Sequence, residues 1–202
     1  MFYKPEEGHK LPHDPFKAIV APRPIGWISS QDEAGNINLV PYSFFNAISD
    51  QPPMVIFSAT GRKSRETACK DSIYNIQKTG EFVVNIVSSE LLNQMNLSSG
   101  IYPKEINEFE LAKLNRGKSQ LVKPPFVMDS PAALECKLFK FITLPGENNI
   151  LVIGTVIGIH INDKFIKNGL LDLLSYKPIG RLGYRDYTEV MNSFPLNRPN
   201  QK

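Results

Sequence analysis

Residues 21–59 read APRPIGWISSQDEAGNINLVPYSFFNAISDQPPMVIFSA, and prolines divide the stretch into apolar runs that are too short for ordinary helices. In the run IGWISS one side of a strand would carry Ile25, Trp27 and Ser29 and the other Gly26, Ile28 and Ser30, because successive side chains point to opposite faces. Asp32, Gly35 and Asn36 then supply turn residues before an extended pattern resumes. The stretch therefore predicts a β-hairpin, followed by a buried strand at 53–59.

Residues 41–46, PYSFFN, place hydroxyl and amide groups among three aromatic rings. Pro41 cannot donate a hydrogen bond in a strand ladder, so we expect a bent edge strand or a loop here. Aromatic faces beside polar side chains suit a planar ligand with a polar rim. An equally good alternative is that Phe44 and Phe45 plug the end of a barrel.

The rest of the chain combines further strands with short helices. Asp71 or Ser72 can cap a helix that runs to Lys78, and Gly80 stands where a glycine commonly follows a helix. Further strands are expected near 16–20 and at 81–87, 133–143 and 150–161, with a broken helical excursion at 89–118.

Length and composition describe one globular domain. A chain of 202 residues, 42% hydrophobic and 21% charged, has the composition of an ordinary globular protein. At this size about 70% of the unfolded surface is buried on folding. We expect a single domain over 1–202, mainly β with peripheral helices, with a core at about 15–187, an N-terminal arm at 1–15 and a C-terminal tail at 188–202.

Several classes of function are disfavoured by the sequence. The net charge of +3 is small and scattered, which argues against nucleic acid, and no apolar run approaches the roughly 20 residues of a membrane span. The start of the chain lacks the pattern of a secretory signal, so we expect a cytoplasmic protein. Cys69 and Cys136 are expected to be buried thiols, and no metal site is expected because the three histidines lack zinc-type spacing.

A first candidate site is a place for an anion at the start of the helix that begins near residue 71. Unpaired N–H groups at a helix start attract phosphate, and neighbouring lysine and hydroxyl groups strengthen the attraction. The simpler alternative is a solvated basic turn before a capped helix. The candidate residues are Ser58, Arg62, Lys63, Ser64, Arg65, Lys70, Asp71 and Ser72.

A second candidate site is an aromatic and polar group in the hairpin region. Together with the anion site it matches the two ends of FMN, a flat tricycle with a polar rim and a terminal phosphate. The G-x-G-x-x-G and P-loop motifs are both absent, which leaves neither of those routes to nucleotide binding. For Trp27 the alternative is an ordinary core residue. The group consists of Trp27, Tyr42, Phe44 and Phe45 with Ser29, Ser43 and Asn46.

His160 is a third candidate. It shares one face of the strand at 150–161 with Gly154 and Gly158, and glycine in a strand often lets another group approach the backbone closely. The imidazole could therefore lie beside a ligand ring and balance charge on a reduced flavin. A structural histidine with satisfied hydrogen bonds is the alternative.

Several segments resemble, in sequence and in order, the flavin reductase-like family over roughly residues 15–187. The sequence departs from the family at Val40, where alanine is more common, and at Tyr184, near which many members have a second glycine. The matching segments are APRPIGWISS at 21–30, NLVPYSFFNA at 38–47, PPMVIFS at 52–58, KDS at 70–72, NI at 75–76, GEFVVN at 80–85, GIH at 158–160 and YKPIGRLG at 176–183.

The resemblance implies an FMN-binding split β-barrel of Greek-key topology, usually a homodimer with the flavin near the subunit interface. Members include the reductase components of two-component monooxygenases and the electron carrier flavoredoxin. It implies that the isoalloxazine contacts Arg23, Pro24, Ile25, Gly26, Trp27, Ile28 and Ser29 and the loop Pro41, Tyr42, Ser43, Phe44, Phe45 and Asn46. Ser58, Arg62, Lys70, Asp71 and Ser72 are expected to hold the phosphate, with His160 and Tyr184–Tyr187 near the ring or a nicotinamide.

The expected activity is an FMN-dependent oxidoreductase that accepts a hydride from NADH or NADPH. The flavin supplies the chemistry, which is consistent with the lack of a nucleophile elbow or a carboxylate pair. Electrons would pass to free flavin, oxygen or a partner monooxygenase. The alternative is a flavoredoxin-like carrier that another protein reduces, and a weaker one is a flavin-free dimeric scaffold.

Overall fold

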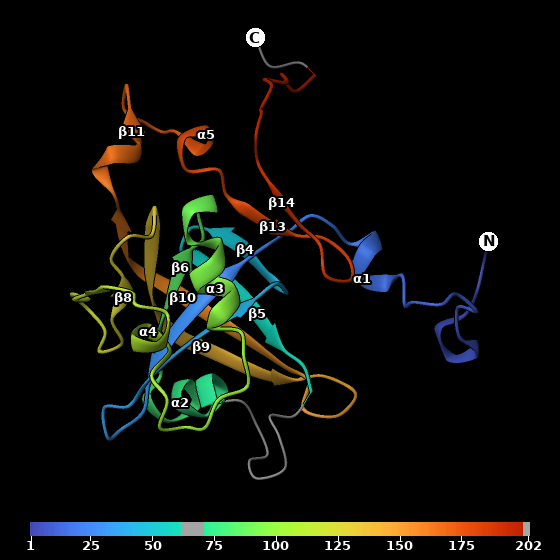
Figure 1. Cartoon of the computed structure of the whole chain (residues 1–202), viewed down its shortest axis with the longest axis horizontal. Coiled ribbons are helices and arrows are strands. Elements are labelled where there is room, and N and C mark those ends of the chain that lie inside the picture. Colours follow the sequence, from blue (N-terminus) through green and yellow to red (C-terminus); the bar gives the residue numbers. More distant parts are fainter. Residues whose placement is uncertain (62–70, 200–202) are drawn as a thin grey trace.

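A sheet of seven strands forms the centre of the computed structural model, which describes residues 1–61 and 71–199 (Figure 1). Every pairing in the sheet is antiparallel, and the spatial order is β3-β2-β6-β9-β10-β5-β4. Because β6 and β10 each pair with strands distant in sequence, the sheet is not a simple meander. The strands are β2 Gly26–Gln31, β3 Ile37–Tyr42, β4 Phe45–Asp50, β5 Pro53–Ala59, β6 Glu81–Ile86, β9 Ala132–Thr143 and β10 Ile150–Ile161.

The predicted hairpin is confirmed as β2 and β3, which pair from Gly26 opposite Tyr42 to Gln31 opposite Ile37. Its turn is held by the Asp32 carboxylate, which accepts hydrogen bonds from the N–H groups of Ala34 at 3.0 Å and Asn36 at 2.8 Å. The four strands predicted from residue 53 to residue 161 are confirmed as well, as β5, β6, β9 and β10.

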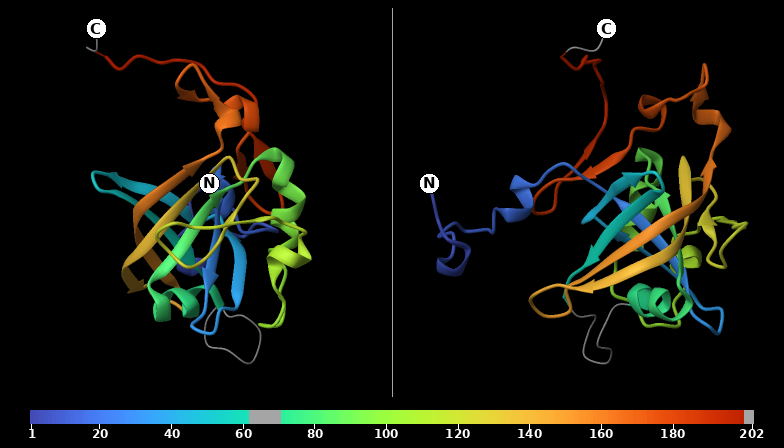
Figure 2. Two further views of the ribbon diagram at one scale, coloured as in Figure 1. Left: turned by 90° about the vertical axis from the view of Figure 1, so that its left-hand side faces the viewer. Right: turned by 180° about the vertical axis from the view of Figure 1, so that it is seen from behind.

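The sheet curls into a barrel because its two edge strands, β3 and β4, are joined by only Ser43 and Phe44. So short a connection holds the end of β3 beside the start of β4, while the β4–β5 hairpin extends outward from the barrel (Figure 2). The Ser58 N–H of β5 donates to the Phe44 carbonyl at 2.8 Å, which fastens the corner. The prediction for 41–46 therefore holds in part: Pro41 lies near the end of one edge strand, and Phe45 begins the other edge.

Alternation along β2 places its apolar side chains in two of the core clusters. Ile28 is fully buried in one cluster with Phe57 and Phe82. Trp27, also fully buried, belongs to a second cluster with Met95 and Phe109, which the helical excursion covers. That excursion is broken as predicted, into η2 Ser89–Leu91, α3 Leu92–Leu97 and α4 Glu108–Leu111.

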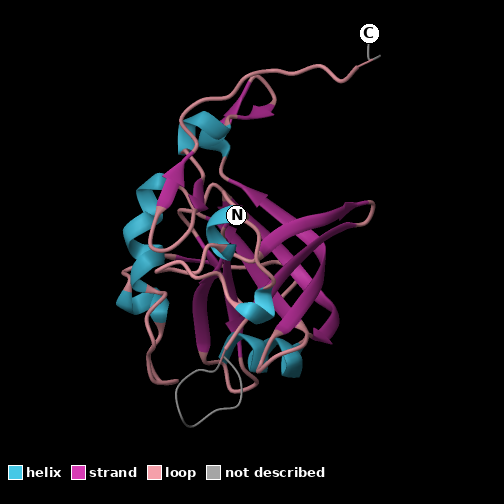
Figure 3. Ribbon diagram, turned by 90° about the vertical axis from the view of Figure 1, so that its right-hand side faces the viewer, coloured by secondary structure: helices cyan, strands magenta, loops and turns pink. Residues whose placement is uncertain are grey.

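Helices lie around the strands rather than between them (Figure 3). α2 Asp71–Thr79 packs its buried face, which includes Ile73 and Ile76, into the first cluster. Gly80 follows it with φ +71°, a left-handed conformation that favours glycine, and its N–H donates to the Ile76 carbonyl at 2.9 Å. The predicted helix and its glycine are thus confirmed. Cys136 is buried with a free thiol, and Cys69 lies outside the described residues.

The strand expected near 16–20 is wrong, because the structure has the short helix α1 Phe16–Ile19 there. The Asp14 carboxylate accepts from the Phe16 N–H at 2.9 Å and favours a helical turn. Phe16 and Ile19 remain exposed, so this apolar run does not enter the core. Both chain ends extend away from the barrel (Figure 1), and η1 Pro5–Glu7 lies in the N-terminal one.

Smaller sheets surround the barrel. β1 Arg23–Pro24, β13 Ile179–Arg181 and β14 Tyr187–Glu189 form a three-stranded sheet that ties the start of the hairpin to the C-terminal region. Among the described residues, no helix is both long and apolar enough to span a bilayer. The remaining elements are β7 Arg116–Gly117, β8 Phe126–Val127, η3 Asp163–Phe165, β11 Ile166–Lys167, β12 Leu170–Leu171 and α5 Leu173–Tyr176.

Candidate functional site

Two neighbouring cavities lie where the closed corner of the barrel meets the loop after α3. The first, which we call the hydroxyl lobe, has a volume of about 220 Å³ and extends from Asn38 to the start of α2. The second, the cationic lobe, has about 290 Å³ and lies beside the Pro41–Phe44 corner. Thr60 and Ser99 line both lobes, so the lobes meet at these two side chains.

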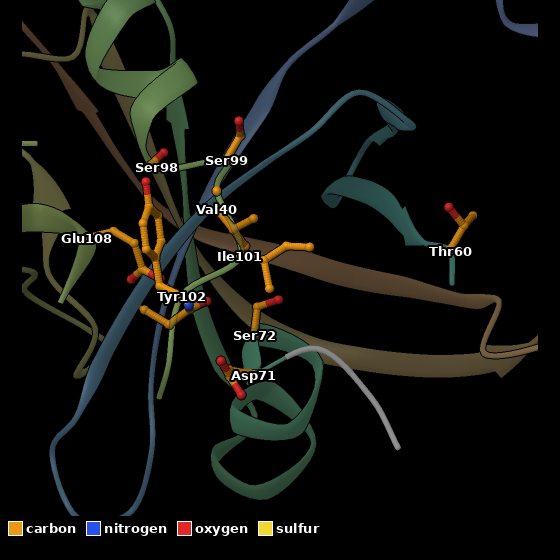
Figure 4. A pocket seen from close by; sticks show the side chains of 11 residues that line it. Val40, Thr60, Asp71, Ser72, Ser98, Ser99, Ile101, Tyr102 and Glu108 are labelled. Atoms are coloured by element: carbon orange, nitrogen blue, oxygen red, sulfur yellow. Dashed lines mark hydrogen bonds between the residues drawn. The ribbon is translucent and has the colours of Figure 1, made fainter. Parts of the chain in front are cut away.

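Hydroxyl groups from three separate segments line the hydroxyl lobe: Ser72 from α2, Thr60 after β5, and Ser98, Ser99 and Tyr102 from the loop after α3. Figure 4 shows Ser98, Ser99 and Ile101 of that loop beside Val40, with Asp71 and Ser72 at the first turn of α2. Such a lining can hydrogen-bond a ligand that carries several hydroxyl groups.

In this lobe the acidic side chain is hydrogen-bonded within the protein, whereas the amide side chain keeps one unpaired atom. The Glu108 carboxylate is buried and accepts from the Asn38 side-chain amide at 3.0 Å and from the Leu39 N–H at 3.0 Å. The side-chain carbonyl oxygen of Asn38, Oδ1, is buried and has no hydrogen-bond partner in the described part of the chain. An unpaired buried acceptor is costly, so a donor from a ligand would be favourable here.

The loop after α3, residues 98–107, is tethered over the hydroxyl lobe at both ends. The Trp27 indole N–H donates to the Ser98 hydroxyl at 2.8 Å, and the Lys104 ammonium lies 3.1 Å from the Asp32 carboxylate. Burial alone would raise the pKa of Asp32, but hydrogen bonds from Asn36 and Lys104 outweigh it and hold that pKa at about 2. The hairpin turn therefore keeps a negative charge that anchors the loop.

Arg23 forms the wall of the cationic lobe. It is only 6% exposed, and it donates from Nη1 to the carbonyls of Lys17 and Val20 and from Nη2 to the Leu182 carbonyl at 2.8 Å. These bonds hold α1 and the turn after β13 against the barrel. Its buried Nε has no partner in the described part of the chain.

The ring-binding and phosphate-binding regions predicted from the sequence are brought together. The Tyr42 hydroxyl from the barrel corner and the Ser72 hydroxyl of α2 are 2.5 Å apart. Of the predicted residues, Arg23, Ile25, Pro41, Tyr42, Ser43, Phe44 and Ser58 line the cationic lobe, and Asp71 and Ser72 line the hydroxyl lobe.

Other predicted residues lie elsewhere. Trp27 is core beneath the helical excursion, the alternative considered for it, and Ile28 lies in the first core cluster. The Ser29 hydroxyl donates to the Pro125 carbonyl at 2.6 Å, and the Phe45 ring packs against Gly26. The residues that line neither lobe are Pro24, Gly26, Trp27, Ile28, Ser29, Phe45 and Asn46. Arg62, Lys63, Ser64, Arg65 and Lys70 lie outside the described residues.

His160 lines neither lobe within one chain. Its Nε2 lies 2.5 Å from a carboxylate oxygen of Glu135, and its ring stacks on Phe126 with centroids 4.3 Å apart. A β-bulge between Val156 and Gly158 puts Gly154 on the face opposite to Gly158 and His160, so the expectation that all three share one face is wrong. Both glycines have another explanation than a ligand. A Cβ at Gly154 would lie 2.4 Å from the Phe82 ring, and one at Gly158 would touch Leu121 and Glu135, so protein side chains use that space.

Sequence reasoning missed the loop after α3 and most of the basic groups. Ser98, Ser99 and Gly100 form a run of small residues after a helix, and such a run does not by itself predict a place in a ligand site. Lys17 and Arg181 are distant in sequence. The fold brings them to one lobe because each contacts Arg23. Within the described ranges, no group of three or more His, Cys, Asp or Glu side chains is placed to hold a metal ion.

Comparison with known proteins assigns the curled antiparallel barrel to a family. The sequence profile described as "flavin reductase like domain" matches residues 20–178. A protein of Aquifex aeolicus is 36% identical over 88% of this chain and 89% of its own length, and one of Halalkalibacterium halodurans is 34% identical over 89% and 87%. The chain therefore belongs to the flavin reductase like domain family.

Solved structures show the same fold. Nitrilotriacetate monooxygenase component B from Bacillus cereus is 28% identical and aligns with a TM-score of 0.86 over 97% of this chain and 98% of that one. The 2-nitrobenzoate 2-nitroreductase of Pseudomonas fluorescens is 27% identical, with a TM-score of 0.80 over 91% and 88%. Flavoredoxin of Desulfovibrio vulgaris, at 21% identity and a TM-score of 0.74 over 88% and 91%, shares the fold. The expected split β-barrel is thus confirmed.

Proposed function

We propose that this protein binds FMN across the two lobes and works as an oxidoreductase. The observation that carries the proposal is the 2.5 Å contact between Tyr42 and Ser72, because it makes the predicted ring and phosphate regions parts of one site. The unpartnered Arg23 Nε and Asn38 oxygen fit a ligand with both acceptors and donors, as the flavin rim and the ribityl chain have. Membership of the flavin reductase family supports the same choice.

The lining of each lobe fits one end of the cofactor. Ile25, Phe44 and the Pro41–Ser43 backbone would lie against the isoalloxazine, and Ser72 and Ser99 would hydrogen-bond the ribityl hydroxyls. When bound, FMN would supply the redox chemistry by accepting a hydride from a nicotinamide donor and passing electrons onward. The chain itself would orient the ring and place the Arg23 charge beside it.

We further propose that NADH or NADPH is the electron donor, with free flavin, oxygen or a partner monooxygenase as acceptor. The names of two similar structures, a monooxygenase component and a nitroreductase, support a reductase over a passive binder. The alternative is an electron carrier that another protein reduces, as the name of the more distant flavoredoxin suggests.

Mixing the FMN-loaded protein with NADH or NADPH without oxygen distinguishes a reductase from an electron carrier. We expect the flavin absorbance near 450 nm to bleach within roughly seconds, since typical enzymes turn over about 1–1000 times per second. A protein that binds FMN but is reduced only by dithionite would be a carrier, and one that binds no FMN would overturn the whole proposal.

At the phosphate end we propose that Lys70 and the first turn of α2 hold the anion. Lys70→Ala is expected to weaken FMN binding about tenfold and to leave riboflavin binding unchanged, because only FMN carries the phosphate. Lys78→Ala is the matched control, since Lys78 is an exposed lysine at the other end of α2. Flavin fluorescence quenching measures both affinities, and equal losses for the two flavins would remove Lys70 from this role.

We also propose that the protein is a cytoplasmic homodimer. Strands β9 and β10 expose apolar side chains, including Phe139, which is 64% exposed, and Ile159, which is 59% exposed. Exposed apolar patches commonly mark protein–protein interfaces, so we propose that these strands contribute to the dimer contact. Sedimentation velocity would report a single species near twice the monomer mass of 22.7 kDa.

A further inference from the structure

The cationic lobe collects positive charge without an acidic partner in its lining. Lys17, Arg23 and Arg181 line it, and none of the other lining residues in the described part of the chain is Asp or Glu. A lobe walled by low-dielectric protein and lined by one sign of charge focuses its potential and attracts ions of the opposite sign. The lobe is therefore electrostatically prepared for an anion.

The two arginines are held close together by the fold. Arg23 of β1 and Arg181 of β13 are direct cross-strand partners. Like charges placed opposite one another destabilise a sheet. Burial, and next the charge of Arg181, lower the pKa of Arg23, which shows the same repulsion. Such an arrangement is relieved when an anion lies near both groups.

The hydrogen bonds of the arginines satisfy their N–H groups without neutralising their charge. Arg23 donates only to backbone carbonyls, of Lys17, Val20 and Leu182. Arg181 donates from Nη2 to the Tyr184 carbonyl at 2.7 Å. A carbonyl is a dipole and not an ion, so both positive charges remain available to a ligand.

Aromatic rings lie beside these cations. The Arg181 guanidinium lies 4.3 Å from the Tyr187 ring centroid, and the Lys17 ammonium lies 6.0 Å from that of Phe44. Tyr184 also lines the lobe and is 53% exposed. A flat ligand can pack against such rings while its anionic group reaches Lys17 and Arg181.

The flavin's own phosphate does not account for this charge if it binds as proposed. The start of α2 lines the hydroxyl lobe, whereas the arginines line the other one. FMN has a single phosphate, which cannot occupy both places. The charges of Lys17 and Arg181 are then left for the anionic group of another ligand.

We propose that the cationic lobe is the subsite for the anionic group of a second, ring-bearing ligand, which Arg181 and Lys17 hold next to the flavin. This rests on the proposed function, because the second ligand is the flavin's reaction partner. The group is a carboxylate on an aromatic acid or the pyrophosphate of a dinucleotide, which share the chemistry that arginine recognises.

Arg181→Gln tests the subsite, with benzoate and ADP-ribose as anionic probes and benzamide and adenosine as their neutral counterparts. Calorimetry on the protein with and without FMN measures each affinity. We expect at least one anion to bind the natural chain and to lose about tenfold or more in the variant, while its neutral counterpart binds weakly to both. Benzoate binding identifies an aromatic acid, and ADP-ribose binding identifies a dinucleotide.

Arg185→Gln is the matched control, because Arg185 is an exposed arginine near Arg181 that lines neither lobe. It should leave every affinity within about twofold of the natural chain. The subsite is overturned if FMN binds but no anion exceeds its neutral counterpart. It is also overturned if Arg181→Gln lowers FMN affinity much more than riboflavin affinity, which would place the flavin's own phosphate among the arginines. Failure of FMN itself to bind would instead count against the proposed function.

Discussion

Replacing Glu135 with glutamine is expected to lower the free energy of unfolding by about 3 kcal/mol. Glu135 is 1% exposed, and its carboxylate accepts from the N–H groups of Gln120 at 2.7 Å, Leu121 at 2.6 Å and Val122 at 3.1 Å. A glutamine of the same size turns an NH₂ group toward at least one of these donors. It therefore loses charge-assisted hydrogen bonds and brings donors face to face.

The pH dependence of this effect follows from the environment of Glu135. Burial alone would raise the pKa of Glu135, but hydrogen bonds from Gln120, His160 and Leu121 outweigh it and the net pKa lies below the ordinary value of 4.5. A lowered pKa in the folded state contributes stability above the ordinary value, and this contribution is lost as the pH falls through the lowered value. The difference between the natural chain and the variant should therefore shrink below about pH 4.

Urea unfolding at pH 7 and at pH 3 measures both effects. Glu110→Gln is the control, because Glu110 is exposed and its ion pair with Arg116 is expected to contribute less than about 1 kcal/mol. A loss below about 1 kcal/mol for Glu135→Gln at pH 7 would contradict a stabilising role for this carboxylate.

The contact between Glu135 and His160 also allows a test of the role of His160. His160→Gln should destabilise the fold less than Glu135→Gln does, because three backbone N–H groups still hold the carboxylate. If His160 acts on the flavin, as the sequence suggested, the variant also changes the rate of flavin reduction or the flavin potential. Unchanged rate and potential with lowered stability would leave His160 a structural partner of Glu135.

The fold could be predicted where local pattern and tertiary environment agree. Alternation in IGWISS and the turn at Asp32 defined the hairpin, because each face of β2 meets its own core cluster. The apolar run at Phe16–Ile19 misled, because an apolar pattern does not say whether a segment reaches the core, and here it packs at the edge of the site as a helix. Strand periodicity is thus informative only inside the sheet.

The part of the candidate site at the barrel corner could be predicted from the sequence, but the part formed by the loop after α3 and by Arg181 could not. Pro41–Phe44 and Ser72 carry recognisable chemistry in local sequence, and they line the lobes. Ser98, Ser99 and Arg181 reach the cavity only through long-range contacts, such as the bond between Trp27 and Ser98. The role of His160 stays a prediction, and the sequence did not reveal its contact, since Glu135 lies 25 residues away on a neighbouring strand.

Ser99→Trp is expected to weaken FMN binding about 100-fold, which is the largest functional effect that we predict. Ser99 and Thr60 line both lobes, so a flavin that spans them must pass between these side chains. Ser99 is exposed, so the fold should tolerate the larger side chain, but an indole in the passage costs roughly 3 kcal/mol when the ribityl chain must share the space.

Lumiflavin makes the test specific, because it has the isoalloxazine without the ribityl phosphate and needs only the cationic lobe. It should bind Ser99→Trp and the natural chain with affinities within about threefold of each other, as measured by flavin fluorescence. Asn96→Trp places the same side chain on an exposed position of α3 that lines neither lobe, and it should bind both flavins normally. If Ser99→Trp instead binds FMN as the natural chain does, the cofactor does not cross from one lobe to the other. The contact between Tyr42 and Ser72 would then join two unrelated cavities.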